Sequence, residues 1–126
     1  VWSQLRPRGT PPCGRLSHIG VALDHKTFFV FGGYDGKSRL NDVFLLHIGS
    51  ELINKIVYFE NNLSSFKTDK ALWAEPIYHG RVPSKRLGHS AATVGDKILI
   101  FGGDDDHKDR ELLNDVHIFD YSTSIK

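Results

Sequence analysis

Two kinds of side chain that could take part in chemistry recur at matching places along the chain. Arg15 lies three residues before His18, and Arg86 lies three residues before His89. Histidine suits acid–base catalysis or metal binding, and arginine suits the binding of carboxylates or carbonyl oxygens. A catalytic group is needed once in a site, whereas a structural hydrogen bond is needed in every copy of a repeated unit. The recurrence therefore favours structural roles for all four residues.

The acidic run Asp104-Asp105-Asp106, followed by His107, offers possible ligands for a cation. It lacks the alternating ligands, the central glycine and the distal glutamate of a calcium loop. We expect it to present negative charge to a basic partner or to water. Cys13 is the only cysteine, which excludes an intrachain disulfide and a zinc site made of several cysteines. We predict no metal, no cofactor and no catalytic residue, since no hydrolase, zinc-protease or Walker motif occurs.

The composition is typical of a water-soluble globular domain. The chain has 126 residues, 40% hydrophobic and 25% charged, with a net charge of +1. No global field directs it to nucleic acid or to an anionic membrane, so neither is expected as a partner. The single cysteine favours a reducing compartment and hence the cytoplasm. Because the sequence starts at Val1 rather than Met, we expect a piece of a longer protein.

One long sequence pattern occurs twice. The first copy begins with Trp2, Gly9, Pro12, Arg15 and His18. The second copy has the same residue types in the same order, at Trp73, Gly80, Pro83, Arg86 and His89. The pattern continues with Gly32-Gly33 and Asn41-Asp42-Val43, matched by Gly102-Gly103 and Asn114-Asp115-Val116. Small slips in spacing fall between the matched segments, where loops tolerate insertions. The chain is therefore a tandem repeat.

Short apolar runs between these residues predict β-strands. Phe28–Phe31 and Ile98–Phe101 both precede a Gly-Gly pair, and Val43–Leu46 is a further run with a more polar counterpart at Val116–Phe119. Continuous apolarity predicts burial on both faces. The gaps, such as Tyr34–Arg39, are too short for crossover helices. The pattern therefore predicts antiparallel sheets stacked on one another, as in the blades of a β-propeller.

The ordered set of repeated residues resembles the kelch family of β-propellers. The resemblance implies an all-β fold with about two four-stranded antiparallel blades, an N-terminal outer strand and an incomplete last blade. Its four strands, a to d from the centre outwards, are expected at His18–Leu23, Thr27–Gly32, Asp42–His47 and Trp73–Ile77 in the first blade. The second blade is expected to use His89–Val94, Lys97–Gly102 and Asp115–Asp120. Trp2–Leu5 is expected to be an outer strand d that belongs to another blade.

The resemblance also divides the chain, as one partial propeller over residues 1–126. Residues 1–14 would be the outer strand and its loop, residues 15–77 the first blade, and residues 86–120 strands a to c of the second. Kelch repeats span about 50 residues, so the longer spacing here implies an insertion between strands c and d at about residues 48–72. Its apolar segment Ile56–Phe59 would extend the blade or cap one face of the propeller.

The residues that define the repeat are predicted to be structural. We expect the glycine pairs to allow close approach of the backbone, the tryptophans to pack between blades, and the arginines to bind buried carbonyls or the repeated aspartates. This set comprises Trp2, Arg15, His18, Gly32, Gly33, Asp42, Trp73, Arg86, His89, Gly102, Gly103 and Asp115.

The residues that differ between the two copies are the candidates for binding. In kelch propellers the d–a and b–c loops emerge on one face, which is commonly the binding face. The resemblance places on that face the loop residues Arg6, Arg8, Cys13, Tyr34, Asp35, Lys37, Arg39, Tyr78, His79, Arg81, Lys85, Asp104, Asp105, Asp106, His107, Lys108, Asp109 and Arg110.

The resemblance implies a non-catalytic module that recognises a protein or peptide, as the recognition or regulatory part of a larger protein. One alternative is the regulatory kelch region of an enzyme, such as a Ser/Thr phosphatase, or of a ubiquitin-ligase adaptor. Another is a kelch enzyme related to sugar epimerases or copper oxidases, although the Tyr–Cys cross-link and histidine ligands of the oxidases are not reproduced. Association of copies is also open, because the N-terminal strand d could complete the last blade of a neighbour. Three copies would then close a six-bladed ring.

Overall fold

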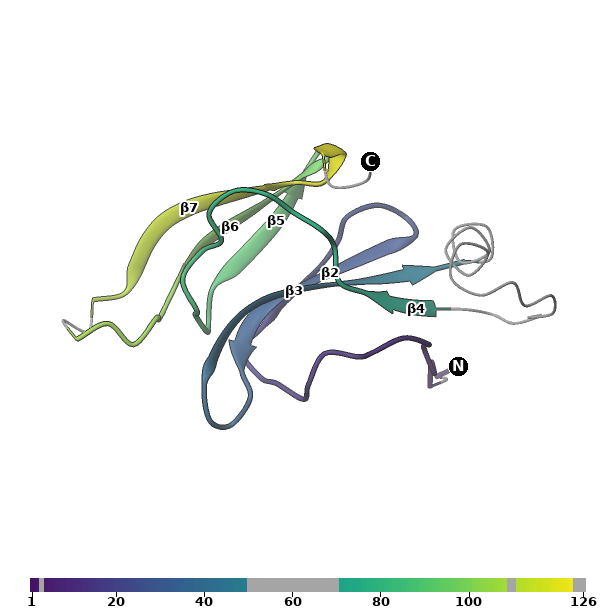
Figure 1. Ribbon diagram of the computed structural model, residues 1–126, viewed down its shortest axis with the longest axis horizontal. Coiled ribbons are helices and arrows are strands. Elements are labelled where there is room, and N and C mark those ends of the chain that lie inside the picture. Colours follow the sequence, from purple (N-terminus) through teal and green to yellow (C-terminus); the bar gives the residue numbers. More distant parts are fainter. Residues whose placement is uncertain (3, 50–70, 109–110, 124–126) are drawn as a thin grey trace.

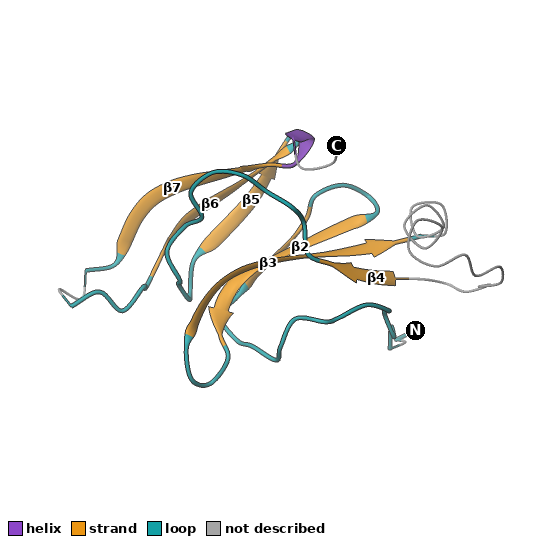
Figure 2. Cartoon of the chain, viewed as in Figure 1, coloured by secondary structure: helices purple, strands orange, loops and turns teal. Residues whose placement is uncertain are grey.

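The computed structural model describes residues 1–2, 4–49, 71–108 and 111–123, which form two antiparallel sheets (Figure 1). The first sheet has the order β1 (Ile19–Ala22), β2 (Thr27–Tyr34), β3 (Arg39–Ile48) and β4 (Ala71–Ala74). The second has the order β5 (Ser90–Val94), β6 (Lys97–Gly103) and β7 (Leu113–Asp120). Strands and loops make up the described chain apart from one 3₁₀ turn, Tyr121–Thr123 (Figure 2). No helix among these residues is long and apolar enough to cross a membrane.

The two sheets are the two predicted blades, with three strands of each near their expected positions. The first strand d lies at Ala71–Ala74 and so begins earlier than the predicted Trp73. It ends before Pro76, which has no N–H to donate to a strand ladder. Residues 50–70, which contain most of the proposed insertion and its segment 56–59, lie outside the described residues.

The N-terminal segment does not form the outer strand expected at Trp2–Leu5. Its described residues carry no strand, and Trp2 is fully exposed. A strand d is held by its ladder to a strand c, and the described chain supplies no such neighbour at this position. Further along, Arg8 lies beside β4: its N–H donates to the Ala71 carbonyl, and its own carbonyl accepts from the Trp73 N–H, both at 2.9 Å.

The hydrophobic core lies between the two sheets. The register places Phe31 opposite both Ile19 and Val43, so these side chains share one face of the first sheet. Ile98 and Ile100 of β6 pack against that face. Phe29 and Ile98 are completely buried, and the Phe29 ring lies 5.1 Å from that of Phe119. The interface between the blades is therefore the core of the described chain.

The first sheet is buried on its other face as well. Val30, Phe44 and Leu46, which alternate with the core residues along β2 and β3, are buried. The Trp73 ring packs edge-on against Phe44 at 6.4 Å, and the Arg15 guanidinium lies 5.6 Å from the Phe44 ring centre. Continuous apolar strands thus correspond to burial on both faces in this sheet.

The glycine pairs mark a bulge in both blades. The register shifts between Phe31 and Gly33, and again between Phe101 and Gly103. Gly33 has a φ of 99°, and a Cβ placed there would lie 2.7 Å from the Leu16 carbonyl oxygen. The chain can pass this close only because glycine has no side chain.

Candidate functional site

Both repeated arginines bind a repeated aspartate through two hydrogen bonds. Arg15 donates to the two Asp42 carboxylate oxygens at 2.5 and 3.0 Å, and Arg86 donates to those of Asp115 at 2.8 and 2.8 Å. Such paired bonds match the planar guanidinium to the carboxylate. Each arginine is therefore held by a carboxylate of its own blade.

The remaining donors of these arginines bind carbonyl oxygens. Arg15 Nη1 donates to the Gly32 carbonyl at 3.1 Å, and Arg86 Nη1 donates to the Gly102 carbonyl at 3.0 Å. The hydrogen bonds from Arg86 hold the pKa of Asp115 well below its usual range. The hydrogen bond to Asp42 raises the pKa of Arg15. Each ion pair thus fastens the bulge to the start of strand a.

The repeated histidines have different environments. His89 is buried and donates from Nε2 to the Phe31 carbonyl of the other sheet at 3.0 Å, with its ring edge-on to Phe31. Its Nδ1 has no hydrogen-bond partner among the described residues, and burial lowers its pKa. His18, at the same position of the first blade, is exposed. His89 is therefore a contact between blades.

An ion pair joins the b–c loops of the two blades. Arg39 lies 3.1 Å from an Asp104 carboxylate oxygen and 3.6 Å from one of Asp106, and its Nε donates to the Asp104 carbonyl at 3.1 Å. The Ser84 hydroxyl donates to Asp105 at 3.3 Å. The backbone N–H of Asp106 and the Arg39 guanidinium both lower the pKa of Asp104. The acidic run is thus tied to the first blade and to the d–a connection.

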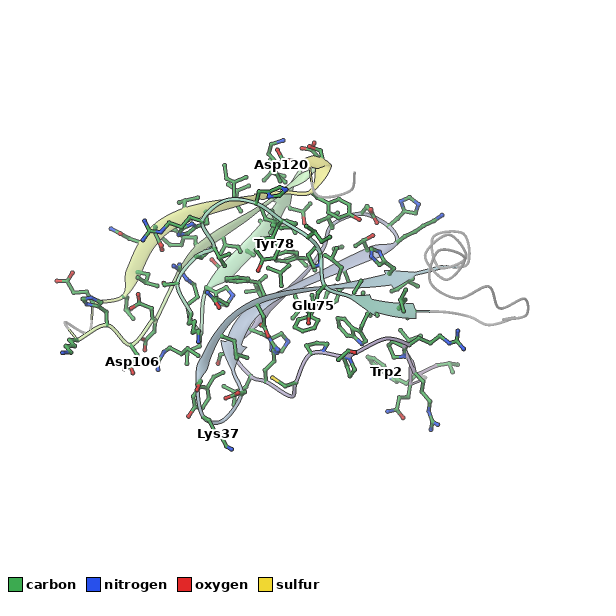
Figure 3. The ribbon with its side chains drawn as sticks, in the orientation of Figure 1. Trp2, Lys37, Glu75, Tyr78, Asp106 and Asp120 are labelled. Atoms are coloured by element: carbon green, nitrogen blue, oxygen red, sulfur yellow. The ribbon has the colours of Figure 1, made fainter. Side chains whose placement is uncertain are left out.

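The b–c loop of the first blade is a tight turn. The Asp35 carboxylate accepts hydrogen bonds from the N–H groups of Lys37 and Ser38 at 2.8 and 2.7 Å, and these backbone donors lower its pKa. Gly36 has a φ of 96°, which suits glycine at this position. Lys37 is exposed at the tip of this loop, and Asp106 lies on the loop of the second blade (Figure 3).

The predicted binding residues fall into three groups. The first group lies on the two b–c loops or next to Ser84, and it comprises Tyr34, Asp35, Lys37, Arg39, Lys85, Asp104, Asp105, Asp106, His107 and Lys108. Arg6 and Arg8 lie apart from them, on the segment that runs beside β4. Tyr78, His79 and Arg81 line a cavity of about 180 Å³ between the sheets. Cys13 is exposed and contacts Arg15, and Asp109 and Arg110 lie outside the described residues.

The cavity is lined by the connection from β4 to β5 and by core residues of both sheets. Tyr78 packs edge-on against Phe119 at 6.4 Å, and Phe31, Val82 and His117 form part of the wall. His117 lies 2.7 Å from an Asp115 oxygen and so belongs to the Arg86 ion-pair network. The space is a gap in the packing between the blades and is separate from the loop tips.

Two residues that join the blades were missed at the sequence level. Asn41 donates from its side chain to the Pro83 carbonyl at 3.1 Å, and Ser84 binds both Asp105 and the Arg86 guanidinium. Asn41 recurs as Asn114, so its repetition was a usable signal. Ser84 has no counterpart at the matching position, Cys13, and nothing in the sequence marks it. Among the described residues, no three His, Cys, Asp or Glu side chains are grouped to hold a metal ion.

Comparison with known proteins agrees with this architecture. Residues 85–125 match the family described as the Kelch motif. The chain is 35% identical over 91% of its length to a leucine-zipper-like transcriptional regulator 1 homolog of Drosophila melanogaster. It is 32% identical over 82% of its length to a rat Rab9 effector protein with kelch motifs, and 27% identical over 97% to bovine kelch domain-containing protein 2.

The chain spans only 10%, 23% and 30% of these three proteins, respectively. The match therefore concerns the repeated blades rather than the whole of any relative. With the order of repeated residues, the two antiparallel blades and the motif at residues 85–125, it shows that the chain belongs to the kelch-repeat family.

Proposed function

We propose that this chain is a non-catalytic recognition module that binds a protein or peptide partner through its loop face. The loop face is defined as residues 34–39 and 104–108 together with Ser84 and Lys85. The observation that carries the proposal is the contact of Arg39 with Asp104 and Asp106, which joins loops of two different blades. Loops held in place before binding lose less conformational entropy when a partner is bound.

The chemistry of the loop face suits a partner that carries both polar and charged groups. Lys85 and His107 are exposed close to the acidic run, and Lys37 is exposed at the tip of the other loop, so the loop face carries charges of both signs. Tyr34 is half-buried at the end of β2 and offers an aromatic side chain of the kind that anchors interfaces. Strands that carry such loops form a scaffold on which the loops vary without loss of the fold.

The relatives also support a recognition role. Their names describe a transcriptional regulator homolog and a Rab9 effector, which are different roles. A stretch of sequence shared by proteins with different roles is better explained by recognition than by one common reaction. Regulation of an attached enzyme, or the role of an adaptor, would use the same face.

Site-specific photo-cross-linking tests this proposal. A photoreactive amino acid is placed at Lys37, on the loop face, and in a matched chain at His25, which is exposed in the turn between β1 and β2 at the other end of the strands. Both chains are irradiated in a cytosolic extract, because the single cysteine predicts a reducing compartment. We expect discrete adducts from Lys37 that an excess of unlabelled chain suppresses, and much weaker ones from His25.

A loop-face variant provides the second arm of the experiment. Arg39→Ala removes the contact between the loops, and it should reduce the Lys37 adducts while the circular dichroism spectrum is preserved. Equal labelling from both positions, or Lys37 adducts that excess unlabelled chain does not suppress, would show that the loop face is not the binding surface.

A further inference from the structure

The contact between the two blades has a buried histidine near each of its ends. Thr27 and His47 lie on the face of the first sheet that meets the second, at the end of the strands remote from the b–c loops. His89 comes just before β5 and lies at the other end, against the bulge of the first sheet. His47 is 5% exposed and His89 is 7% exposed. We call this contact, from His47 to His89, the seam.

The hydrogen bond of His89 decides where its ring carries a proton. Nε2 lies 3.0 Å from the Phe31 carbonyl oxygen, which can only accept, so Nε2 is protonated in the neutral ring. Nδ1 is then bare, and it is buried without a hydrogen-bond partner among the described residues. A second proton would have to enter at Nδ1, where a charged N–H would be buried without an acceptor.

The surroundings of His89 oppose its protonation as well. Burial is the largest effect on its pKa, and Arg86 and His18 add to it as positive neighbours. The hydrogen bond to Phe31 opposes them only in part, so the pKa of His89 stays below its ordinary value of 6.5. The ring is held in place, because it lies edge-on to Phe31 and its Cε1 would be 2.8 Å from a Cβ on Gly32.

His47 closes the other end of the seam in a similar way. Its Nδ1 lies 3.4 Å from the Thr27 hydroxyl oxygen, and both side chains are buried. The Tyr121 side chain of the second blade packs against the core at this end, with Thr27 as its polar neighbour. The imidazole of His47 therefore lies where the two blades meet, as that of His89 does.

The charges near His47 do not make up for its burial. The turn between β1 and β2 supplies Asp24 and Lys26, which lie beside the end of β3. On the second sheet Lys97 lies 3.5 Å from an Asp120 oxygen, so these two charges offset each other. Asp24 favours a positive imidazole, but burial outweighs it and lowers the pKa of His47.

We propose that the seam is an acid-sensitive clamp, which holds the two blades together while His47 and His89 are neutral. Histidine changes its charge in the physiological pH range, and its protonation at an interface can act as a switch. Below a pH of 6.5, the ordinary pKa of histidine, the unfolded chain binds a proton on each ring that the folded chain excludes. The stability of the seam is therefore complete above that pH and falls as the pH decreases.

Release of the clamp would also separate the two b–c loops. Arg39 and Asp104 face each other across the same seam, so their ion pair depends on the blades staying together. Binding of a partner at the loop face would then be lost in mild acid, and this consequence rests on the proposed function. The acid sensitivity of the seam does not rest on it, because both histidines lie outside the loop face.

Urea unfolding at about pH 7.5 and about pH 5.5, an interval in which aspartates stay ionised, tests the proposal. The unfolding constant should rise over this interval by up to about tenfold for each of the two histidines. His89→Gln keeps an N–H for the Phe31 carbonyl, and His47→Asn keeps a polar group beside Thr27. Each of these variants lacks one titrating ring and should lose that ring's share of the rise. His25→Gln, at an exposed position, is the matched control and should keep the full rise.

Nuclear magnetic resonance of the histidine rings measures protonation without any substitution, so it decides even where a variant fails to fold. In the unaltered chain, His47 and His89 should still be neutral at a pH where the exposed His25 is half protonated. Titration of either buried ring together with His25 would overturn the clamp. A rise in the unfolding constant that His89→Gln and His47→Asn leave unchanged would overturn it too.

Discussion

At the scale of single residues, the most buried charge in the described chain belongs to the scaffold. The Arg86 side chain is 1% exposed, and its donors bind Asp115, the Gly102 carbonyl and Ser84. The same arrangement at Arg15 shows that it serves to build a blade. A buried guanidinium is tolerated here because its carboxylate partner and several further acceptors replace the water that it loses.

Replacement of Arg86 by glutamate should destabilise the fold strongly. Asp115 would then face a second negative charge, and the Gly102 carbonyl would lose its donor. Loss of one partner from a buried pair costs about 3–5 kcal/mol, and we expect about 3 kcal/mol because the Asp115 side chain is 38% exposed and therefore screened by water. Urea unfolding would measure the loss. Arg81→Glu, at an exposed position, should have little effect, and an unchanged midpoint for Arg86→Glu would disprove the structural role.

At the scale of the elements, the bulge after strand b determines how one blade meets the next. Gly32 and Gly102 occupy the same place in their strands and have nearly equal φ angles. At Gly32 the second blade lies directly against the backbone, whereas at Gly102 no described atom of another sheet lies within 4 Å of the Cβ position. The bulge therefore positions a contact between blades in addition to bending its own strand.

The two glycines allow the contact between blades to be measured separately from backbone strain. Gly32→Ala and Gly102→Ala both force a side chain into the left-handed region, at a cost of about 1 kcal/mol or more. Gly32→Ala must also displace His89, so its free energy of unfolding should fall by roughly 1–3 kcal/mol more, the range typical of overpacking. Chemical denaturation of the two variants gives the difference. Equal losses would show that the docking of His89 contributes nothing.

At the scale of the whole molecule, neither sheet has a complete core of its own. The core lies between the sheets, where Ile98 and Ile100 pack on Phe29 and Phe31. Repeat proteins gain stability from such contacts between neighbouring units. The two described blades should therefore unfold together rather than one after the other.

Ile98→Ala tests this cooperativity. Removal of a fully buried isoleucine costs about 2–5 kcal/mol. In a Trp2→Phe background Trp73 is the sole tryptophan and reports on the first sheet. The unfolding midpoint reported by Trp73 fluorescence should fall as far as the unfolding midpoint reported by circular dichroism, although the substitution lies in the second sheet. A Trp73 transition that does not move would show that the sheets unfold independently.

The strands were predictable because their signals are local. The runs Phe28–Phe31 and Ile98–Phe101 are short, apolar and bounded by turn residues, and β2 and β6 include both of them. The pairing of Arg15 with Asp42 was also predictable, because both residues recur in the second copy. Strand d at Trp2–Leu5 was not, since an outer strand depends on a neighbour far away in the chain or in another molecule. Repetition of a tryptophan does not supply that neighbour.

The sequence by itself determined that the chain is a tandem β-repeat, where most strands lie, and which residues build the blades. Those properties depend on local periodicity and on the recurrence of residue types. Only the tertiary structure decided that Arg39 of one blade holds the acidic run of the other, that Arg6 and Arg8 lie apart from that group, and that His89 is buried while His18 is exposed. These facts depend on which surfaces meet. Two residues with the same place in a repeat acquire different environments when, among the described residues, only one of them meets another blade.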